Sequence, residues 1–260
     1  MKANEYYRAS SLEDAYQKLM ESPKNAIISG GLWMKKTGQS YETLIDLSKL
    51  GLDKISETKE EVVVCSMVTQ RDFENSKVVS FLYAGAPAFA AREVMGVNFR
   101  NLATIGGSIM GRYPFSDVIS GLLPYDVELE FYPEQRMSLE EYLGYKGKLN
   151  AILVAIHIKK EEGKGYFKKV KTTALDFPIV NIAVAKVKGE YRVVVGARPM
   201  VAARSYKAME YLNNGGKDFA HAAELAVEEL SFMDNKDASK EYRVDLAKVY
   251  VRRGLEEVSK

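Results

Sequence analysis

Two of the three pairs of adjacent glycines are the residues of this sequence whose type and spacing could do chemistry, while the third, Gly215-Gly216, predicts the end of a helix. Gly30-Gly31 follows the apolar segment Ala26-Ile27-Ile28, and Gly106-Gly107 lies within Thr104-Ile105-Gly106-Gly107-Ser108. Glycine tolerates positive φ and lets a ligand approach the main chain, so successive N–H groups can converge on phosphate oxygens. The pairs indicate two candidate anion-binding loops, although an isolated Gly-Gly is more often a plain turn.

Few other residues suggest catalysis. The sequence has no P-loop, no strand-following Gly-x-Gly-x-x-Gly and no Gly-x-Ser-x-Gly elbow. His157 and His221, the only histidines, lack the spacing of a metal site, so we expect structural roles for them. The single cysteine, Cys65, cannot form an internal disulfide or hold an iron–sulfur cluster. The absence of a visible acid, base or nucleophile is typical of a protein whose redox cofactor performs the chemistry.

Composition places the chain among ordinary folded proteins. It has 260 residues, of which 47% are hydrophobic and 28% charged, enough for one large domain or two smaller ones. Its 37 basic and 35 acidic residues leave a net charge of +2, which provides no global field for nucleic acid or anionic membrane. No apolar run approaches the ~18 residues needed to span a bilayer, so we expect no membrane span and a cytoplasmic location.

Helices and strands alternate in the part of the chain that must position the glycine pairs. Apolar periodicity and capping residues predict a helix from Ser11 to about Ser22, a helix capped by Thr69, a helix over Pro87–Met95 and a short helix after Pro114. Valine-rich or alternating segments predict strands at 26–28, 43–47, 61–65, 127–131 and 152–158. Residues 104–108 are expected to form a loop.

The last third of the chain has a different pattern. An antiparallel meander is predicted over 167–171, 179–186 and 191–197, with a turn at 188–190, followed by three helices with Ser205 and Ser239 as N-caps. We therefore place a domain boundary near Gly163. Residues 1–163 would form a mixed α and β domain, and residues 164–260 a small sheet covered by helices.

A long run around the second glycine pair resembles a known signature. Asn98–Ser108, followed by Pro114-Phe115-Ser116-Asp117, is similar to the pattern of the FAD-binding (medium) subunits of molybdenum hydroxylases of the xanthine dehydrogenase and carbon monoxide dehydrogenase type. Other family landmarks occur in the same order, namely Ile28–Gly31, Leu44–Ser48, Phe167–Val170 with Asp176–Pro178, and Asp237–Arg243. The resemblance therefore extends over nearly the whole chain.

The resemblance implies an α+β fold and a flavin site. The expected fold is a two-subdomain FAD-binding fold of the PCMH (vanillyl-alcohol-oxidase-like) type, over residues 1–163. A small carbon monoxide dehydrogenase flavoprotein-like C-terminal domain with a three-stranded antiparallel sheet and helices would follow over residues 164–260. FAD would lie between the N-terminal subdomains, its pyrophosphate held by the main chain of Ser29, Gly30, Gly31, Leu32, Trp33, Thr104, Ile105, Gly106, Gly107 and Ser108.

Three side chains complete the implied site. Asp117 would accept a hydrogen bond from a ribityl or ribose hydroxyl, and Lys169 or its neighbour Lys168 would reach the flavin ring or a phosphate. The alternative for Asp117 is a charge that interacts with a helix dipole, and for the lysines it is solvent exposure. No catalytic or metal-ligating residue is implied on this chain.

The family relation also implies partners. Electrons would pass from a molybdopterin-binding large subunit through [2Fe–2S] clusters of a small subunit to FAD on this chain, and then to NAD⁺ or another acceptor. Departures leave an alternative open, because Leu32 stands where the family usually has a small polar residue and Gly111-Arg112-Tyr113 replaces small residues. The alternative is a flavin-free assembly or interaction subunit with the same fold.

Overall fold

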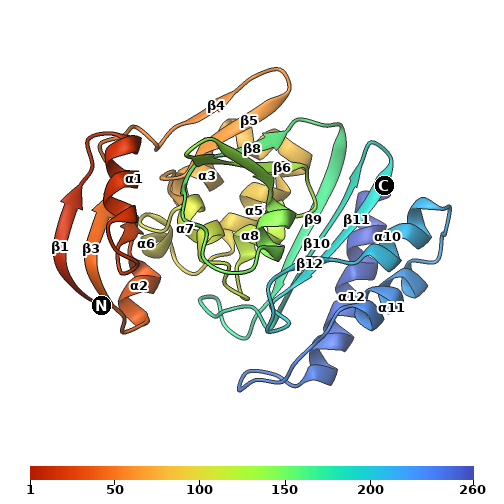
Figure 1. Cartoon of the computed structure of the whole chain (residues 1–260). Helices are drawn as coiled ribbons and strands as arrows, with labels where there is room; N and C mark the ends of the chain where they lie inside the picture. The colour runs from red at the N-terminus through yellow and green to blue at the C-terminus, as the bar shows by residue number, and fades with distance from the viewer.

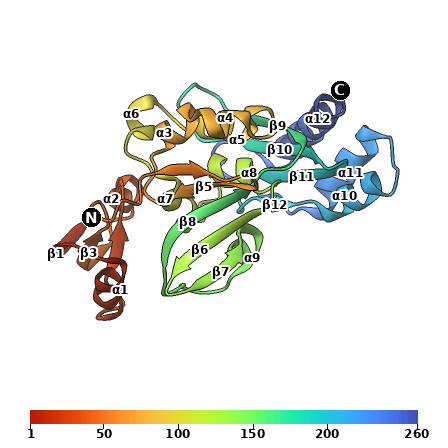
Figure 2. The ribbon, with the colours of Figure 1, turned by 90° about the horizontal axis from the view of Figure 1, so that it is seen from above.

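The computed structural model describes all residues 1–260 and contains three β-sheets with helices between and around them (Figures 1 and 2). The first sheet is parallel, with the order β1 (Lys2–Arg8), β3 (Ser40–Asp46), β2 (Ala26–Ile28). It carries α1 (Leu12–Met20), capped by Ser11 as predicted, and the short α2 (Leu32–Lys36). Strand β1 was not predicted, because it is an exposed edge strand without apolar alternation.

The second sheet is antiparallel and lies at the centre of the molecule. Its order is β4 (Ile55–Glu57), β5 (Glu61–Cys65), β8 (Ile152–Lys159), β6 (Val127–Tyr132), β7 (Gln135–Ser138). A helical layer accompanies this sheet: α3 (Gln70–Asn75), α4 (Lys77–Phe81), η1 (Leu82–Gly85), α5 (Ala86–Arg92), α6 (Val97–Arg100), α7 (Ile105–Met110), α8 (Asp117–Leu122) and α9 (Leu139–Gly144).

The third sheet separates this helical layer from the last three helices. Its order is β12 (Ala203–Arg204), β11 (Glu190–Gly196), β10 (Val180–Val187), β9 (Gly163–Val170), all antiparallel. One face packs on α5 and α8, and the other on the bundle of α10 (Tyr206–Asn213), α11 (Phe219–Glu229) and α12 (Lys240–Val258) (Figure 2). The sheet has four strands instead of the predicted three, because the added β12 is only two residues long and carries no periodic signal.

The largest hydrophobic core is shared across the expected domain boundary. It joins residues of the second sheet and its helices to Phe167, Ala183 and Val194 of the third sheet. The predicted boundary falls at the start of β9, where the chain leaves one sheet and enters the next. The division into residues 1–163 and 164–260 stays a prediction. No helix in the structure is both long and apolar enough to cross a membrane.

The segment that carries the second glycine pair is helical. Thr104 is the N-cap of α7, and its hydroxyl oxygen accepts a hydrogen bond from the Gly107 N–H at 3.0 Å. The prediction of a loop over residues 104–108 was wrong, because two adjacent glycines suggested flexibility where close packing requires them. A Cβ atom on Gly106 would lie 2.5 Å from the Ser66 carbonyl oxygen.

A buried arginine fastens the last helix to the third sheet. Arg243 is 1% exposed, and its guanidinium donates hydrogen bonds to the carbonyl oxygens of Ile179 and Ala197 and to the side chain of Asn235. These acceptors lie just before β10, just after β11 and before α12, so one side chain joins three chain segments. The family-like landmark at residues 237–243 therefore has a structural explanation.

We expect Arg243→Met to destabilise the chain by about 2–4 kcal/mol, because it leaves two buried carbonyl groups without donors. Urea denaturation followed by circular dichroism measures this. Arg252→Met is the matched control, since Arg252 is half-exposed on the same helix and should change stability by no more than about 0.5 kcal/mol. Equal stabilities of the two variants would contradict the fastening role.

Candidate functional site

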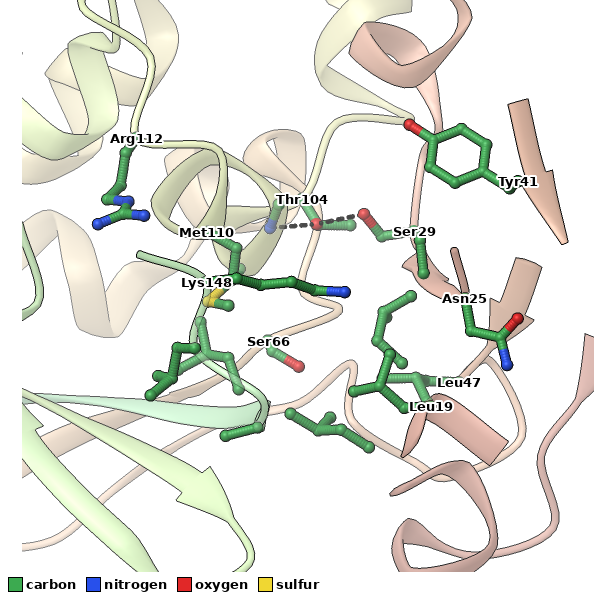
Figure 3. A pocket seen from close by; sticks show the side chains of 18 of the residues that line it. Leu19, Asn25, Ser29, Tyr41, Leu47, Ser66, Thr104, Met110, Arg112 and Lys148 are labelled. Carbon is green, nitrogen blue, oxygen red and sulfur yellow. Dashed lines mark hydrogen bonds between the residues drawn. The ribbon is translucent and has the colours of Figure 1, made fainter. Parts of the chain in front are cut away.

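A cavity opens where the first sheet meets the second sheet and α7 (Figure 3). It has a volume of about 560 Å³, which lies within the range of small-molecule sites. A second hollow of about 260 Å³ shares part of its lining and continues past both glycine pairs. The shared residues are Ala26, Ile27, Ser29, Tyr41, Thr104, Gly107 and Met110. The two hollows therefore form one elongated site.

The first glycine pair has the geometry expected of an anion cradle. Gly31 adopts a left-handed conformation with φ of 65°, which allows the chain to turn into α2. The main-chain N–H groups of Ser29, Gly30 and Gly31 make no hydrogen bond within the chain, and α2 has no side-chain N-cap. The three residues line a hollow, so their unpaired donors are available to an anionic ligand.

The second glycine pair differs from this expectation. The N–H groups of Ile105 and Gly106 donate to the carbonyl oxygens of Val68 and Ser66, and that of Ser108 donates to the Thr104 carbonyl. Since Gly107 donates to the Thr104 hydroxyl, only the Thr104 N–H is free in this segment. The second segment therefore offers a ligand fewer main-chain donors than the first, and the role predicted for it in holding a pyrophosphate stays a prediction.

The two glycine pairs are in direct contact. The Thr104 hydroxyl donates to Ser29 Oγ at 3.1 Å, as Figure 3 shows, which leaves the Ser29 hydroxyl hydrogen free for a ligand. A Cβ atom on Gly30 would lie 2.0 Å from the Leu102 carbonyl oxygen, and one on Gly107 would lie 2.9 Å from both Ser29 Oγ and Thr104 Oγ1. Gly30 and Gly107 are thus required by close approach and not by positive φ.

Asp117 and Lys169 form a buried ion pair. Their side chains are 2% and 1% exposed, and Lys169 Nζ lies 2.9 Å from Asp117 Oδ2. Asn181 donates to Asp117 Oδ1 at 2.8 Å, and Lys169 also donates to the Glu93 carbonyl at 3.0 Å. Burial raises the pKa of the Asp117 carboxyl, and the nearby Lys169 ammonium opposes this rise. The pair borders the end of the site that contains Trp33.

Strand alternation separates the two lysine candidates. Lys169 points from β9 toward Asp117, whereas Lys168 points to the opposite face, where its ammonium lies 5.6 Å from the Tyr250 ring centre. The structure therefore brings Lys169 together with Asp117 and places Lys168 apart from the cavity, against α12. The sequence could not decide between adjacent positions without the strand register.

Leu32 and Trp33 begin α2 beside the free N–H groups. Leu32 lines the smaller hollow, and Trp33 lies at the centre of an aromatic cluster with Phe99, Tyr113, Phe115 and Phe177. The free volume between this cluster and the Asp117–Lys169 pair is only about 30 Å³. The site is therefore open at the cavity between the sheets and closed by aromatic side chains at its other end.

Three basic residues of the cavity were not predicted as site residues. Lys24, Arg112 and Lys148 all line it (Figure 3 labels Arg112 and Lys148). None belongs to a motif: Lys24 and Arg112 lie in turns and Lys148 in an irregular segment, and only Arg112 falls in a sequence, Gly111-Arg112-Tyr113, that departs from the family pattern. The histidines lie outside this cavity: His157 contacts Glu61 and Glu130 between strands, and His221 is on α11. No cluster of potential metal ligands is present.

Comparison with known proteins identifies the class. Residues 2–159 match the FAD binding domain in molybdopterin dehydrogenase, and residues 165–258 match the CO dehydrogenase flavoprotein C-terminal domain. The chain belongs to the family of FAD-binding flavoprotein subunits of molybdopterin dehydrogenases. The predicted family, the α+β fold class and the FAD cofactor are thereby confirmed.

Individual relatives are distant but cover nearly the full length. The chain is 23% identical to the xanthine dehydrogenase FAD-binding subunit of Escherichia coli O157:H7, over 97% of this chain and 94% of that protein. Its fold is similar to a chain of carbon monoxide dehydrogenase from Hydrogenophaga pseudoflava, with a TM-score of 0.90 at 20% identity, covering 98% and 96% of the two chains. Quinoline 2-oxidoreductase from Pseudomonas putida 86 gives a TM-score of 0.87 at 21% identity, with the same coverage.

We expect Gly30→Ala to weaken FAD binding at least tenfold, because the new methyl group must push the first loop away from Leu102 and misplace its free N–H groups. A flavin titration with thermal melts measures this. Gly144→Ala is the control, since a Cβ atom there meets nothing within 4 Å. A folded Gly30→Ala variant with unchanged FAD affinity would show that this contact does not shape the site.

Proposed function

We propose that this chain binds one FAD in the elongated site and serves as the electron-transfer flavoprotein of a molybdenum hydroxylase complex. The observation that carries the proposal is the row of free N–H groups at Ser29, Gly30 and Gly31, which faces a hollow continuous with the 560 Å³ cavity. A pyrophosphate suits this row, because it is anionic and needs several donors within a short distance. The cavity beyond is large enough for the adenosine end of FAD.

The flavin end of the ligand would lie toward Trp33 and the Asp117–Lys169 pair. When bound, FAD supplies the redox chemistry of the subunit, so the chain itself needs only to bind and orient it. Asp117 retains lone pairs that can accept a hydrogen bond from a ribityl or ribose hydroxyl, while Lys169 holds the carboxylate in place. Since the free volume there is about 30 Å³, Trp33 and Phe177 must move apart when a flavin ring enters.

The proposed partners are a molybdopterin-binding large subunit and a small subunit with [2Fe–2S] clusters. Two features support this: the chain belongs to a molybdopterin dehydrogenase family, and its single cysteine cannot hold such clusters. Electrons that leave the flavin would pass to NAD⁺ or another acceptor. The competing proposal is an assembly subunit without flavin, which the apolar Leu32 and the closed aromatic end favour.

We expect FAD, but not FMN, to quench the fluorescence of Trp33, because it is the only tryptophan and lies where the flavin end of FAD would bind. A fluorescence titration with each flavin measures this, and Trp33→Phe should remove the signal while FAD absorbance still shows binding. Binding of FMN in preference to FAD would contradict the proposed cofactor, and no binding of FAD after reconstitution would favour the flavin-free alternative.

We also expect the chain to co-purify from its native source with a molybdopterin protein and an iron–sulfur protein. Gentle affinity purification, followed by metal analysis and mass spectrometry, tests this partnership. Recovery of molybdenum and iron in a stable ratio to flavin would support the proposed complex. Isolation of the chain alone under several mild conditions would count against it.

A further inference from the structure

The charges around the larger cavity have one sign. Lys24, Arg112 and Lys148 line it, and no aspartate or glutamate does. None of the three cations forms an ion pair elsewhere in the chain. Since the whole chain has nearly balanced charge, with 37 basic and 35 acidic residues, this local excess indicates a site for an anion.

Lys148 spans this cavity from one side to the other. It follows α9, in the part of the chain attached to the second sheet, and its ammonium donates to the Pro23 carbonyl at 3.2 Å, beside the first sheet. Figure 3 shows its side chain extended between Thr104 and Ser29 on one side and Ser66 on the other. One weak acceptor leaves most of the ammonium's donor capacity free. The charge is therefore held at the cavity that Ser29 also lines.

Arg112 holds the loop on which Lys148 lies. Its guanidinium donates to the carbonyl oxygens of Tyr145 and Gly147 at 2.5 and 2.9 Å, and lies 5.2 Å from the Tyr142 ring centre. Arg112 adopts a positive φ of 44°, which turns the chain at the end of α7 toward this loop. Tyr145 and Gly147 lie three residues and one residue before Lys148. The two hydrogen bonds from Arg112 therefore fix the position of the main chain from which the Lys148 side chain extends.

We propose that Lys148 is the cation that neutralises the pyrophosphate of FAD in this chain, and that Arg112 is its positioning residue. This inference rests on the proposed function. Lys148 supplies a charge in the cavity that Ser29 also lines, and this cavity continues into the hollow at Gly30 and Gly31, where Leu32 can supply no hydroxyl. A charge-assisted hydrogen bond is stronger than a neutral one, so the lysine more than offsets the apolar residue.

The test uses the full chain, alone or in the complex in which it is purified, with the variants Lys148→Met and Lys148→Arg. Lys236→Met is the matched control, because Lys236 is exposed before α12 and makes no ion pair, so the net charge falls equally. FAD, ADP and riboflavin are titrated at several salt concentrations. Riboflavin has no phosphate and reports any general damage to the flavin end.

Lys148→Met is expected to weaken FAD and ADP binding about ten- to a hundredfold, to leave riboflavin binding unchanged and to make FAD affinity less dependent on salt. Lys148→Arg and Lys236→Met should remain within about threefold of the unaltered chain. Unchanged FAD and ADP affinity in Lys148→Met would overturn the inference alone. Failure of the unaltered chain to bind FAD or ADP would overturn the proposed function and this inference with it.

Arg112→Lys tests the positioning role, since lysine keeps the charge but cannot donate to both carbonyl oxygens as a fork. We expect Arg112→Lys to weaken FAD binding about as much as Arg112→Met does. In a double variant with Lys148→Met, neither change should weaken FAD binding further than Lys148→Met alone. Parental FAD affinity in Arg112→Lys, or additive losses in the double variants, would show that Arg112 does not act through Lys148.

Discussion

The contact between Gly30 and the main chain at Leu102 is the constraint on which the site depends. A side chain at residue 30 would collide with the Leu102 carbonyl, so the first loop can approach the start of α7 only because residue 30 is a glycine. This approach allows the Thr104 hydroxyl to reach Ser29, and it places three residues with unpaired N–H groups at the hollow. This contact holds the first sheet beside α7, and the cavity and the smaller hollow lie where these two parts of the chain meet.

The sequence predicts the elements of this arrangement better than their roles. Strands β2, β3 and β5 and the caps Ser11 and Thr69 could be predicted, because valine-rich runs and capping residues are local signals. The helical state of Gly106-Gly107 could not, because it depends on Ser66, which is distant in sequence. The choice between Lys168 and Lys169 also required the strand register. Family resemblance supplied the identity of the cofactor as FAD, whereas the residues alone indicated only anion-binding loops and redox-cofactor chemistry.

Several residues of the family-like signature act on the scaffold. Arg100 is 6% exposed, donates to the carbonyl oxygens of Val94 and Met95, and lies against Glu74. Arg243 similarly joins the ends of two strands to α12. A buried arginine without its acceptors would be costly, so the fold itself requires the hydrogen bonds that Arg100 and Arg243 make. A match to this signature is therefore stronger evidence for the fold than for contacts with a ligand.

The difference between residues that the fold requires and residues that only a ligand requires also bears on the choice between a flavoprotein and a flavin-free subunit. A subunit that kept only the fold would need Arg100, Arg243 and the glycines that allow close packing. It would have no physical reason to keep three unpaired N–H groups facing a hollow, or a cavity lined by cations without one carboxylate. The three N–H groups are only partly buried and Lys24 and Lys148 are exposed, so water satisfies them in the free chain and folding places no constraint on their arrangement. These features are not needed for folding, and they favour a chain that binds an anionic cofactor even though Leu32 is apolar.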